Sequence, residues 1–232
     1  MKKEIVLALS CLLPITVLAD CNVGAMTLTG TSTSGQWSSL VTLTGQKLTS
    51  STQANNTLES QAATNNPINF TSSNIIAFEY RSVTPINLIG NEQTGGWLLH
   101  NSNTNGTVTS GALFTPTSDS TGLKLVLIGV GNATPKYQSF ETLNSGSNRI
   151  GVYINRQSKQ IGYILNGVNK GYKWSFTDPI NNISFALLNG FSGFTSSSTN
   201  LGKEVTMELI TDHSLLQYTY PTGATDICGN SL

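Results

Sequence analysis

Charged residues are scarce in this chain of 232 residues. Lys and Arg together number 12, Asp and Glu together number 12, and charged residues make up only 10% of the sequence. Because there is no basic surplus to neutralise phosphates, the composition argues against nucleic-acid binding. Solubility depends instead on abundant Ser, Thr, Asn, Gln and Gly. Apolar residues still make up 38%, so the chain resembles a folded extracellular β-protein more than a disordered one.

The sequence also contains few residues arranged as in known catalytic motifs. Only two histidines occur, and one of them, His213, directly follows Asp212 at an expected strand end, where adjacent side chains diverge. The other, His100, has no evident partner. The GFSG string at 190–193 has the wrong spacing for a nucleophile elbow. We expect no catalytic residue, no metal cluster and no cofactor; a calcium ion held by scattered loop oxygens is left open.

Paired carboxylates are not evident either. A glycosidase needs two carboxyl groups about 5–10 Å apart across the scissile bond. Glu204 and Glu208 share one face of an expected strand but lie roughly 13 Å apart along it, too far for a retaining pair. Glu79 is a strand acid between two aromatic residues. The acids whose positions decide whether this is an enzyme are Glu79, Glu141, Asp178, Glu204 and Glu208.

The N-terminus has the layout of a secretory signal. Lys2 and Lys3 precede an apolar run over 5–17, and small residues before Asp20 mark a cleavage site after Ala19. The run is shorter than the roughly 20 residues that a membrane-spanning helix needs. No later segment is apolar enough to span. We therefore predict a signal peptide over 1–19 and export of residues 20–232 to the periplasm, the cell surface or the medium.

Cysteine is rare, and two cysteines remain after the signal is removed. Cys21 and Cys228 lie at opposite ends of the mature chain, and an even count in an oxidising compartment favours a disulfide between them. A metal pair and two free thiols are the alternatives, and the absence of an accompanying His or Cys cluster in the sequence argues against the metal pair. A lipid anchor competes for Cys21, but Asp20 before it does not suit a lipoprotein peptidase, and the apolar stretch before Cys11 is too short.

Short β-type runs separated by turn residues fill the mature chain. Within Glu204–Ile210, Val205 and Met207 face one side while Thr206 and Glu208 face the other, as in a half-buried antiparallel strand. The expected strands are 75–80, 124–130, 149–155, Gln160–Leu165, 183–188, Glu204–Ile210 and 216–220.

The pattern predicts one all-β domain over 20–232, built as a sandwich or jelly roll of antiparallel sheets. We allow one or two helical turns at 57–64 and no other helix after the signal. The polar segment 27–66 is predicted to be a terminal strand followed by long exposed loops. Trp37 and residues 40–43 are its expected contribution to the core.

The stretch 149–172 reads RIGVYINRQSKQIGYILNGVNKGY and predicts a hairpin. Asn166-Gly167 suits a tight type I′ turn because both residues accept positive φ. The stretch resembles SPRY-type and the broader concanavalin A-like sandwich proteins. SPRY proteins often place an acidic residue after the first strand, where this chain has Asn155-Arg156. The resemblance therefore implies a concanavalin A-like jelly roll in the wider sense.

The chain as a whole resembles a family of exported proteins of Acinetobacter-type bacteria, the domain of unknown function 4882. The signal, the length, the terminal cysteines and the Asn/Ser/Gly-rich β character carry this resemblance, which implies no activity.

Aromatic residues supply the candidate binding site. Sugar-binding sandwiches use exposed Trp or Tyr rings, and the candidates here are Trp97, Tyr172 and Trp174, with core packing as the alternative for each. We expect an exported, non-enzymatic binding or surface-interaction domain whose partner is a glycan or a cell-surface protein. The alternatives are a carbohydrate hydrolase or lyase on a jelly roll and a structural subunit of a surface assembly. The oligomeric state is left open.

Overall fold

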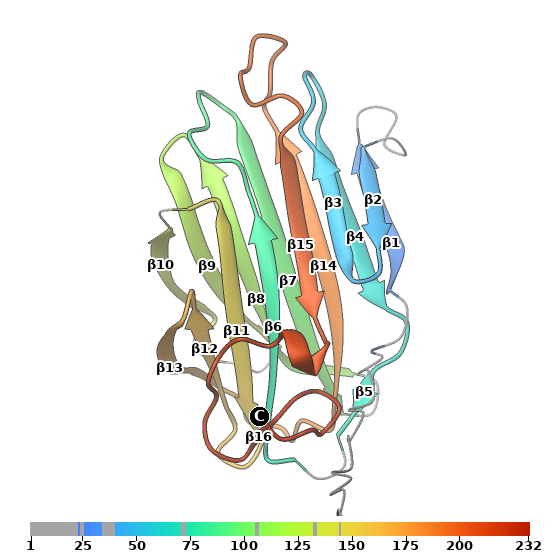
Figure 1. Cartoon of the computed structure of the whole chain (residues 1–232), viewed down its shortest axis with the longest axis vertical. Helices are drawn as coiled ribbons and strands as arrows, with labels where there is room; N and C mark the ends of the chain where they lie inside the picture. The colour runs from blue at the N-terminus through green and yellow to red at the C-terminus, as the bar shows by residue number, and fades with distance from the viewer. Residues whose placement is uncertain are drawn as a thin grey trace, which may run out of the picture.

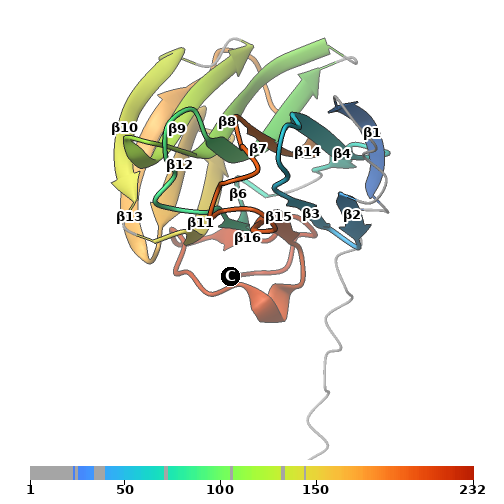
Figure 2. The same cartoon turned by 90° about the horizontal axis from the view of Figure 1, so that it is seen from above.

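The computed structural model describes Val23 and residues 26–33, 40–70, 73–104, 107–131, 134–143 and 145–232. These residues form two facing, predominantly antiparallel sheets, which confirms the predicted all-β jelly-roll sandwich in one domain (Figures 1 and 2). Within these ranges no helix has both the length and the apolar character needed to cross a membrane.

Each sheet contains eight strands, and the chain passes repeatedly from one sheet to the other. Sheet A consists, in spatial order, of β1 (Met26–Thr33), β4 (Leu58–Thr64), β14 (Asn182–Ser192), β7 (Gln93–Thr104), β8 (Thr107–Asp119), β9 (Gly122–Gly131) and β10 (Tyr137–Leu143), with β5 (Ile68–Asn69) beside β14. Sheet B consists of β13 (Val168–Ser175), β12 (Gln160–Leu165), β11 (Ser147–Asn155), β6 (Ile75–Val83), β15 (Glu204–Ile210), β3 (Lys47–Ser51) and β2 (Val41–Thr44), with β16 (Ala224–Thr225) beside β6.

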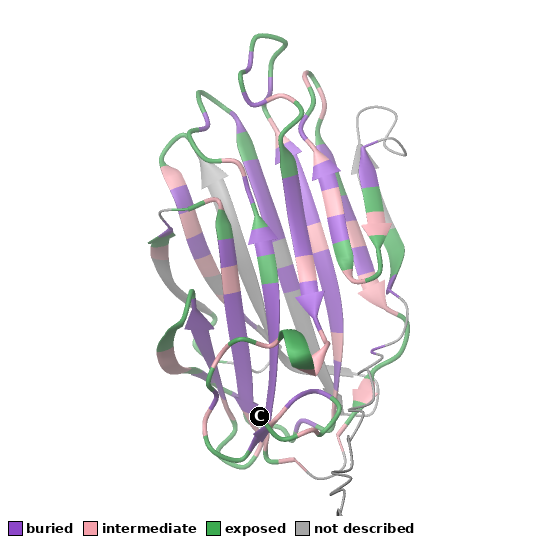
Figure 3. Cartoon of the chain, in the orientation of Figure 1, coloured by how far each residue is buried: buried purple, intermediate pink, exposed green. Residues whose placement is uncertain are grey.

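The main core lies between the two sheets. On β14, Ile183, Phe185 and Leu187 alternate with more exposed residues and are at most 1% exposed. Phe185 meets Phe78 of β6 edge to face, with 4.9 Å between ring centroids. Figure 3 shows that buried residues run along β6, β11 and β12. Alternate side chains of β14 therefore produce the core packing that the sequence predicts. Burial runs almost continuously along β6, β11 and β12, whose other face packs in a second core.

The N-terminal part of the chain contains more strands than we predicted. The expected helical turns at 57–64 are wrong, because the segment forms β4 between β1 and β14. The expected loops after β1 include β2 and β3. Leu40 and Val41 are 5% exposed, which confirms their place in the core, while Trp37 lies outside the described residues. Small inward residues explain the difference: Ser60 and Ala62 are fully buried on β4 but give no apolar pattern.

The predicted hairpin at 149–172 is confirmed. β11 and β12 pair with Ile150 opposite Leu165, and the turn to β13 has φ 46° at Asn166 and φ 87° at Gly167. Asn166 also accepts a 2.9 Å hydrogen bond from the backbone N–H of Arg149, so the turn is fastened to β11.

The predicted strand at 216–220 is wrong. Residues 211–232, which we call the C-terminal strap, run across the outer face of sheet B, starting with the 3-10 turn η1 (His213–Leu215) (Figures 1 and 2). The backbone N–H groups of Gln217 and Tyr218 donate to Glu79 Oε1 at 2.8 and 2.9 Å. These donors serve a carboxylate and not a neighbouring strand, so the apolar alternation of the segment does not produce sheet pairing.

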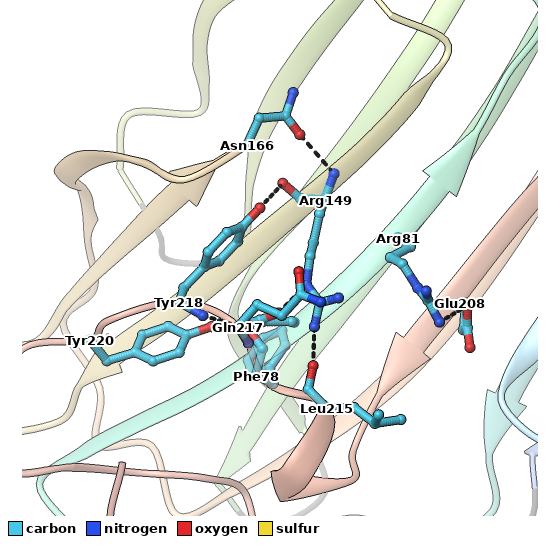
Figure 4. A network of polar contacts seen from close by, with 10 residues as sticks. Phe78, Arg81, Arg149, Asn166, Glu208, Leu215, Gln217, Tyr218 and Tyr220 are labelled. Carbon is cyan, nitrogen blue, oxygen red and sulfur yellow. Dashed lines mark hydrogen bonds and ion pairs between the residues drawn. The ribbon is translucent and has the colours of Figure 1, made fainter.

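Glu79 is the anchor of the strap. It is 0% exposed, and its carboxylate also accepts from Arg149 Nε and, at 3.2 Å, from the Tyr220 hydroxyl. Arg149 in turn donates to the carbonyl of Leu215 and accepts at its own carbonyl from the Tyr218 hydroxyl at 2.8 Å (Figure 4). A buried carboxylate satisfied by this many donors is a structural device that holds the strap in one place.

A second, smaller core lies beneath the strap. Tyr153 and Ile164 of sheet B pack there against Tyr220 and Ala224 of the strap. The backbone approaches the tyrosines so closely that a Cβ atom on Gly151 would lie 2.7 Å from the ring of Tyr218 and 2.7 Å from the hydroxyl oxygen of Tyr220. A Cβ on Gly162 would lie 2.3 Å from the ring of Tyr153. Glycine is needed at both positions because the strap and Tyr153 occupy the space of a side chain.

We expect Glu79→Gln to lower the free energy of unfolding by about 3–5 kcal/mol, because it leaves the Arg149 guanidinium without its buried counter-charge. Urea unfolding measures the change. Glu208→Gln is the matched control: Glu208 pairs with Arg81 at 2.9 Å, but the two side chains are 29% and 49% exposed. The unfolding free energy of Glu208→Gln should fall by no more than about 1 kcal/mol. Equal losses in the two variants would contradict the anchor role of Glu79.

Candidate functional site

At one edge of the sandwich, β13 ends sheet B and β10 ends sheet A on the same side of the molecule (Figures 1 and 2). A pocket lies at this edge, beside β13. Its volume is about 360 Å³. We call it the edge pocket; its lining residues are Thr134, Pro135, Gln160, Tyr172, Lys173, Trp174 and Ser175.

One wall of the edge pocket is fixed by a bridge between the two sheets. Thr134, in the connection between β9 and β10, exchanges backbone hydrogen bonds of 2.8 and 2.9 Å with Ser175 of β13. Their hydroxyl groups also lie within hydrogen-bonding distance, at 3.2 Å. The loop is therefore tied to β13, and the pocket is built into the folded sandwich.

A bulge in β13 decides which aromatic side chain faces this pocket. Trp174 pairs with Ile161 and Tyr172 pairs with Gly162, so Lys173 is an extra residue without a partner in the ladder. In a regular strand, Tyr172 and Trp174 would share a face. The extra residue turns Trp174 into the main core and Tyr172 to the outer face.

The three aromatic residues predicted from the sequence therefore have different positions. Trp174 borders the edge pocket but is only 2% exposed, and its ring lies 6.1 Å from that of Tyr163. This burial favours the alternative of core packing for Trp174. Trp97 is on β7 opposite Leu188, away from the edge pocket, and its side chain lies outside the described part of the chain. Tyr172 alone brings a half-buried ring to the pocket.

The ring of Tyr172 is held by neighbours. It meets the ring of Tyr153 edge to face, with 5.0 Å between centroids, and its hydroxyl accepts from Asn155 Nδ2 at 3.4 Å. Tyr153 is held by a 2.8 Å hydrogen bond to Asn169 and lies 6.4 Å from Tyr220 of the strap. The orientation of Tyr172 is therefore set before any ligand arrives.

Two polar side chains of the edge pocket were missed by the sequence analysis. Gln160 is half-buried, and its amide makes no hydrogen bond with any described residue. Lys173 is exposed and forms no ion pair within the described ranges. Both look like ordinary polar residues of a strand in the sequence. The pocket thus combines an aromatic ring, an available amide and an available ammonium group.

A cross-sheet contact closes the same edge of the sandwich. The Tyr163 hydroxyl, from sheet B, donates to Glu141 Oε1 of sheet A at 2.6 Å, and Lys170 Nζ donates to Glu141 Oε2 at 2.7 Å. Burial raises the pKa of Glu141, but the hydrogen bonds from Lys170 and Tyr163 and the charges of Lys170 and Lys173 outweigh it and lower the pKa below 4.5. Burial, together with the Glu141 carboxylate, raises the pKa of Tyr163.

The other acidic side chains that the structure describes do not gather in a cleft. Glu79 is sealed under the strap and Glu208 is paired with Arg81. Of three pockets lined by described residues, one contains Glu59 and one contains Asp226 as its single carboxylate, and the edge pocket contains none. The described ranges also hold no group of three or more His, Cys, Asp or Glu residues able to bind a metal ion.

His213 and Asp212 do diverge, as their adjacency predicts. Asp212 caps η1 by accepting from the N–H of Ser214 at 2.8 Å, whereas His213 Nδ1 lies 3.0 Å from Asp226 Oδ2. Asp226 also accepts at 2.9 Å from the N–H of Cys228. These contacts fix the end of the strap. Cys21, Ala19 and Asp20 lie outside the described residues, so the disulfide and the cleavage site stay predictions.

The lowered pKa of Glu141 predicts a pH-dependent contribution to stability. The unfolded chain takes up this proton more readily than the folded chain, so Glu141 stabilises the fold above about pH 4.5, and the contribution is lost as the pH falls through the lower folded pKa. The difference in unfolding free energy between wild type and Glu141→Gln should therefore shrink between pH 7 and pH 3, as measured by urea unfolding. A difference that does not change with pH would contradict it. Glu204→Gln, at an exposed position of β15, is the control and should stay within about 0.5 kcal/mol of wild type.

Comparisons with solved structures give similarities at low sequence identity. The chain is similar to a sialidase (9% identity, TM-score 0.39), with 74% of this chain and 15% of that chain covered, so it spans a small part of that protein. It is similar to the carbohydrate recognition domain of Emp46p in its potassium-bound form (10%, TM-score 0.47, 78% and 88% covered). It is also similar to the carbohydrate binding module CBM66 from Bacillus subtilis (10%, TM-score 0.41, 82% and 95% covered).

No match was found among curated proteins. A family model matches residues 49–230, which include every strand from β4 to β16 and the whole edge pocket. The chain belongs to the family described as "Domain of unknown function (DUF4882)".

Proposed function

We propose that this protein is an exported, non-enzymatic carbohydrate-binding domain and that the edge pocket holds the sugar. The observation that carries the proposal is the half-buried ring of Tyr172 beside the available amide of Gln160 and the available ammonium group of Lys173. A ligand pocket of this kind combines an apolar face with a few polar groups that fix orientation. The C–H face of a sugar ring packs on the tyrosine, and its hydroxyl groups bond to the amide and the ammonium.

The pocket is suited to binding because its parts are already ordered. Tyr153 and Asn155 hold the tyrosine ring, and the bridge between Thr134 and Ser175 holds the wall. A ligand then spends little of its interaction free energy on ordering side chains.

The lack of a nearby pair of carboxylates supports binding without cleavage. Glu141, which pairs with Lys170 of β13, has both oxygens engaged by Tyr163 and Lys170. Its lowered pKa keeps it ionised at neutral pH, whereas a general acid needs a raised one. Within the described part of the chain, no carboxylate lines the edge pocket.

Export is the remaining part of the proposal, and it rests on the signal pattern at 1–19 and the two cysteines of the mature chain. We place the mature domain in the periplasm or at the cell surface, with Cys21 joined to Cys228. The covalent link then fixes the N-terminal segment to the strap, which the buried Glu79 already attaches to sheet B.

Replacing Tyr172 with alanine should weaken sugar binding about tenfold, since truncating an aromatic contact at a binding site typically costs more than 1 kcal/mol. A glycan array identifies the ligand, and isothermal titration calorimetry gives its Kd. Tyr172→Phe keeps the ring and should bind within about threefold of wild type.

The matched control for this series is Tyr218→Phe, which removes a hydroxyl from the strap and leaves the edge pocket intact. Circular dichroism shows whether each variant is folded. Unchanged affinity in a folded Tyr172→Ala protein, or release of sugar fragments by the wild type, would contradict the proposal.

The protein purified from the exporting cell should begin at Asp20 and contain the Cys21–Cys228 disulfide. Mass spectrometry without a reductant should then show a mass lower by two hydrogen atoms than after reduction, and peptide mapping should recover the two cysteines in one cross-linked fragment. A retained leader, an acylated cysteine or two alkylatable thiols would each show that this part of the proposal is wrong.

A further inference from the structure

We infer that the protein has a second saccharide-binding site, for neutral sugars, on the outer face of sheet A. A groove of about 270 Å³ lies there, at one end of the neighbouring strands β4, β14 and β7. We call it the glycine groove; its lining residues are Thr57, Leu58, Glu59, Gln93, Thr94, Gly95, Gly190, Phe191 and Ser192.

The floor of the glycine groove is bare backbone. Gly190 of β14 pairs directly with Gly95 of β7 on one side and with Glu59 of β4 on the other. The neighbouring residues Thr94 and Phe191 are 3% exposed, so the alternation of both strands places the two glycines on the outer face. Two side chains are therefore missing at adjacent positions of this face, although both glycines are themselves buried.

Backbone conformation does not explain these two glycines. The described glycines with positive φ, such as Gly171 and Gly193, do not include Gly95 or Gly190. Glycine inside a strand costs stability, since it adds chain entropy and contributes no packing. Both glycines line the groove, and a glycine inside a strand can mark a position where a ligand or another backbone approaches closely.

The polar side chains around the floor come from three strands. Glu59 and Gln93 are exposed and Ser192 is half-buried, and none of the three side chains makes a hydrogen bond or ion pair with a described residue. A carboxylate, an amide and a hydroxyl are the groups that bind the hydroxyls of a sugar. Glu59 is the only charged residue of the lining, so the groove favours a neutral ligand over an anionic one.

The glycine groove is separate from the edge pocket, because β4, β14 and β7 lie at the middle of sheet A and β13 lies at the edge of sheet B. The two sites share no lining residue. Either site can therefore exist without the other, and one spectrum can report on both: the amides of Gly95 and Gly190 for the groove, and the amide of Gly171 for β13 beside Tyr172.

The experiment titrates the ¹⁵N-labelled mature domain with three neutral oligosaccharides, cellohexaose, maltohexaose and chitohexaose. With at least one of them, the amide signals of Gly95 and Gly190 should shift along a saturating curve. No saturating shift at these glycines with any of the three sugars overturns the inference. A shift confined to Gly171 also overturns it, and would support the edge pocket alone.

Variants then test the side chains. Glu59→Gln should weaken the binding that Gly95 and Gly190 report by about tenfold, because it removes a charged hydrogen-bond acceptor. Glu204→Gln, an exposed carboxylate of sheet B, should leave it unchanged. Equal affinity in Glu59→Gln and wild type overturns the role of the groove. Gly190→Val should abolish the shifts by filling the floor; its folding is checked by circular dichroism, and Glu59→Gln carries the test if this variant does not fold.

Discussion

The buried carboxylate of Glu79 is the interaction on which the arrangement of this molecule depends. It accepts from two backbone N–H groups of the strap, from the Tyr220 hydroxyl and from Arg149, so one side chain of β6 holds a segment about 140 residues later in the chain. The strap covers the second core, and a series of ring contacts leads from Tyr220 through Tyr153 to Tyr172. A charge under the strap therefore also supports the ring at the edge pocket.

Large apolar side chains made most of the sandwich predictable. The predicted strands Gln160–Leu165 and Glu204–Ile210 agree with β12 and β15 to the residue, because their inward positions carry Ile, Tyr, Val and Met. The N-terminal strands were not predicted as well. Their inward positions include Ser50, Ser60 and Ala62, which are fully buried without being strongly apolar. Strands whose inward positions carry small residues pack closely, but their sequences show no alternation of apolar and polar residues.

The candidate site was predictable only in part, for reasons of pairing. Tyr172 was found from its residue type, but its relation to Trp174 depends on the bulge at Lys173, which exists only relative to β12. Gln160 and Thr134 reach the same pocket from other segments, and no local pattern joins them. Glu79 was recognised as a strand acid between two aromatic residues, yet its partners lie on β11 and in the strap. The composition of the edge pocket and the partners of Glu79 both depend on contacts between distant segments, and such contacts cannot be read from a single sequence.

Gly151 and Gly162, which lie beneath aromatic side chains, couple sequence changes in distant parts of the chain. Position 151 has room for a side chain only if Tyr218 and Tyr220 move away, and position 162 only if Tyr153 does. A homologue that acquires alanine at 151 must therefore also have lost or rerouted its C-terminal segment. Covariation between position 151 and the final 20 or so residues would accordingly show which homologues retain a C-terminal strap over sheet B.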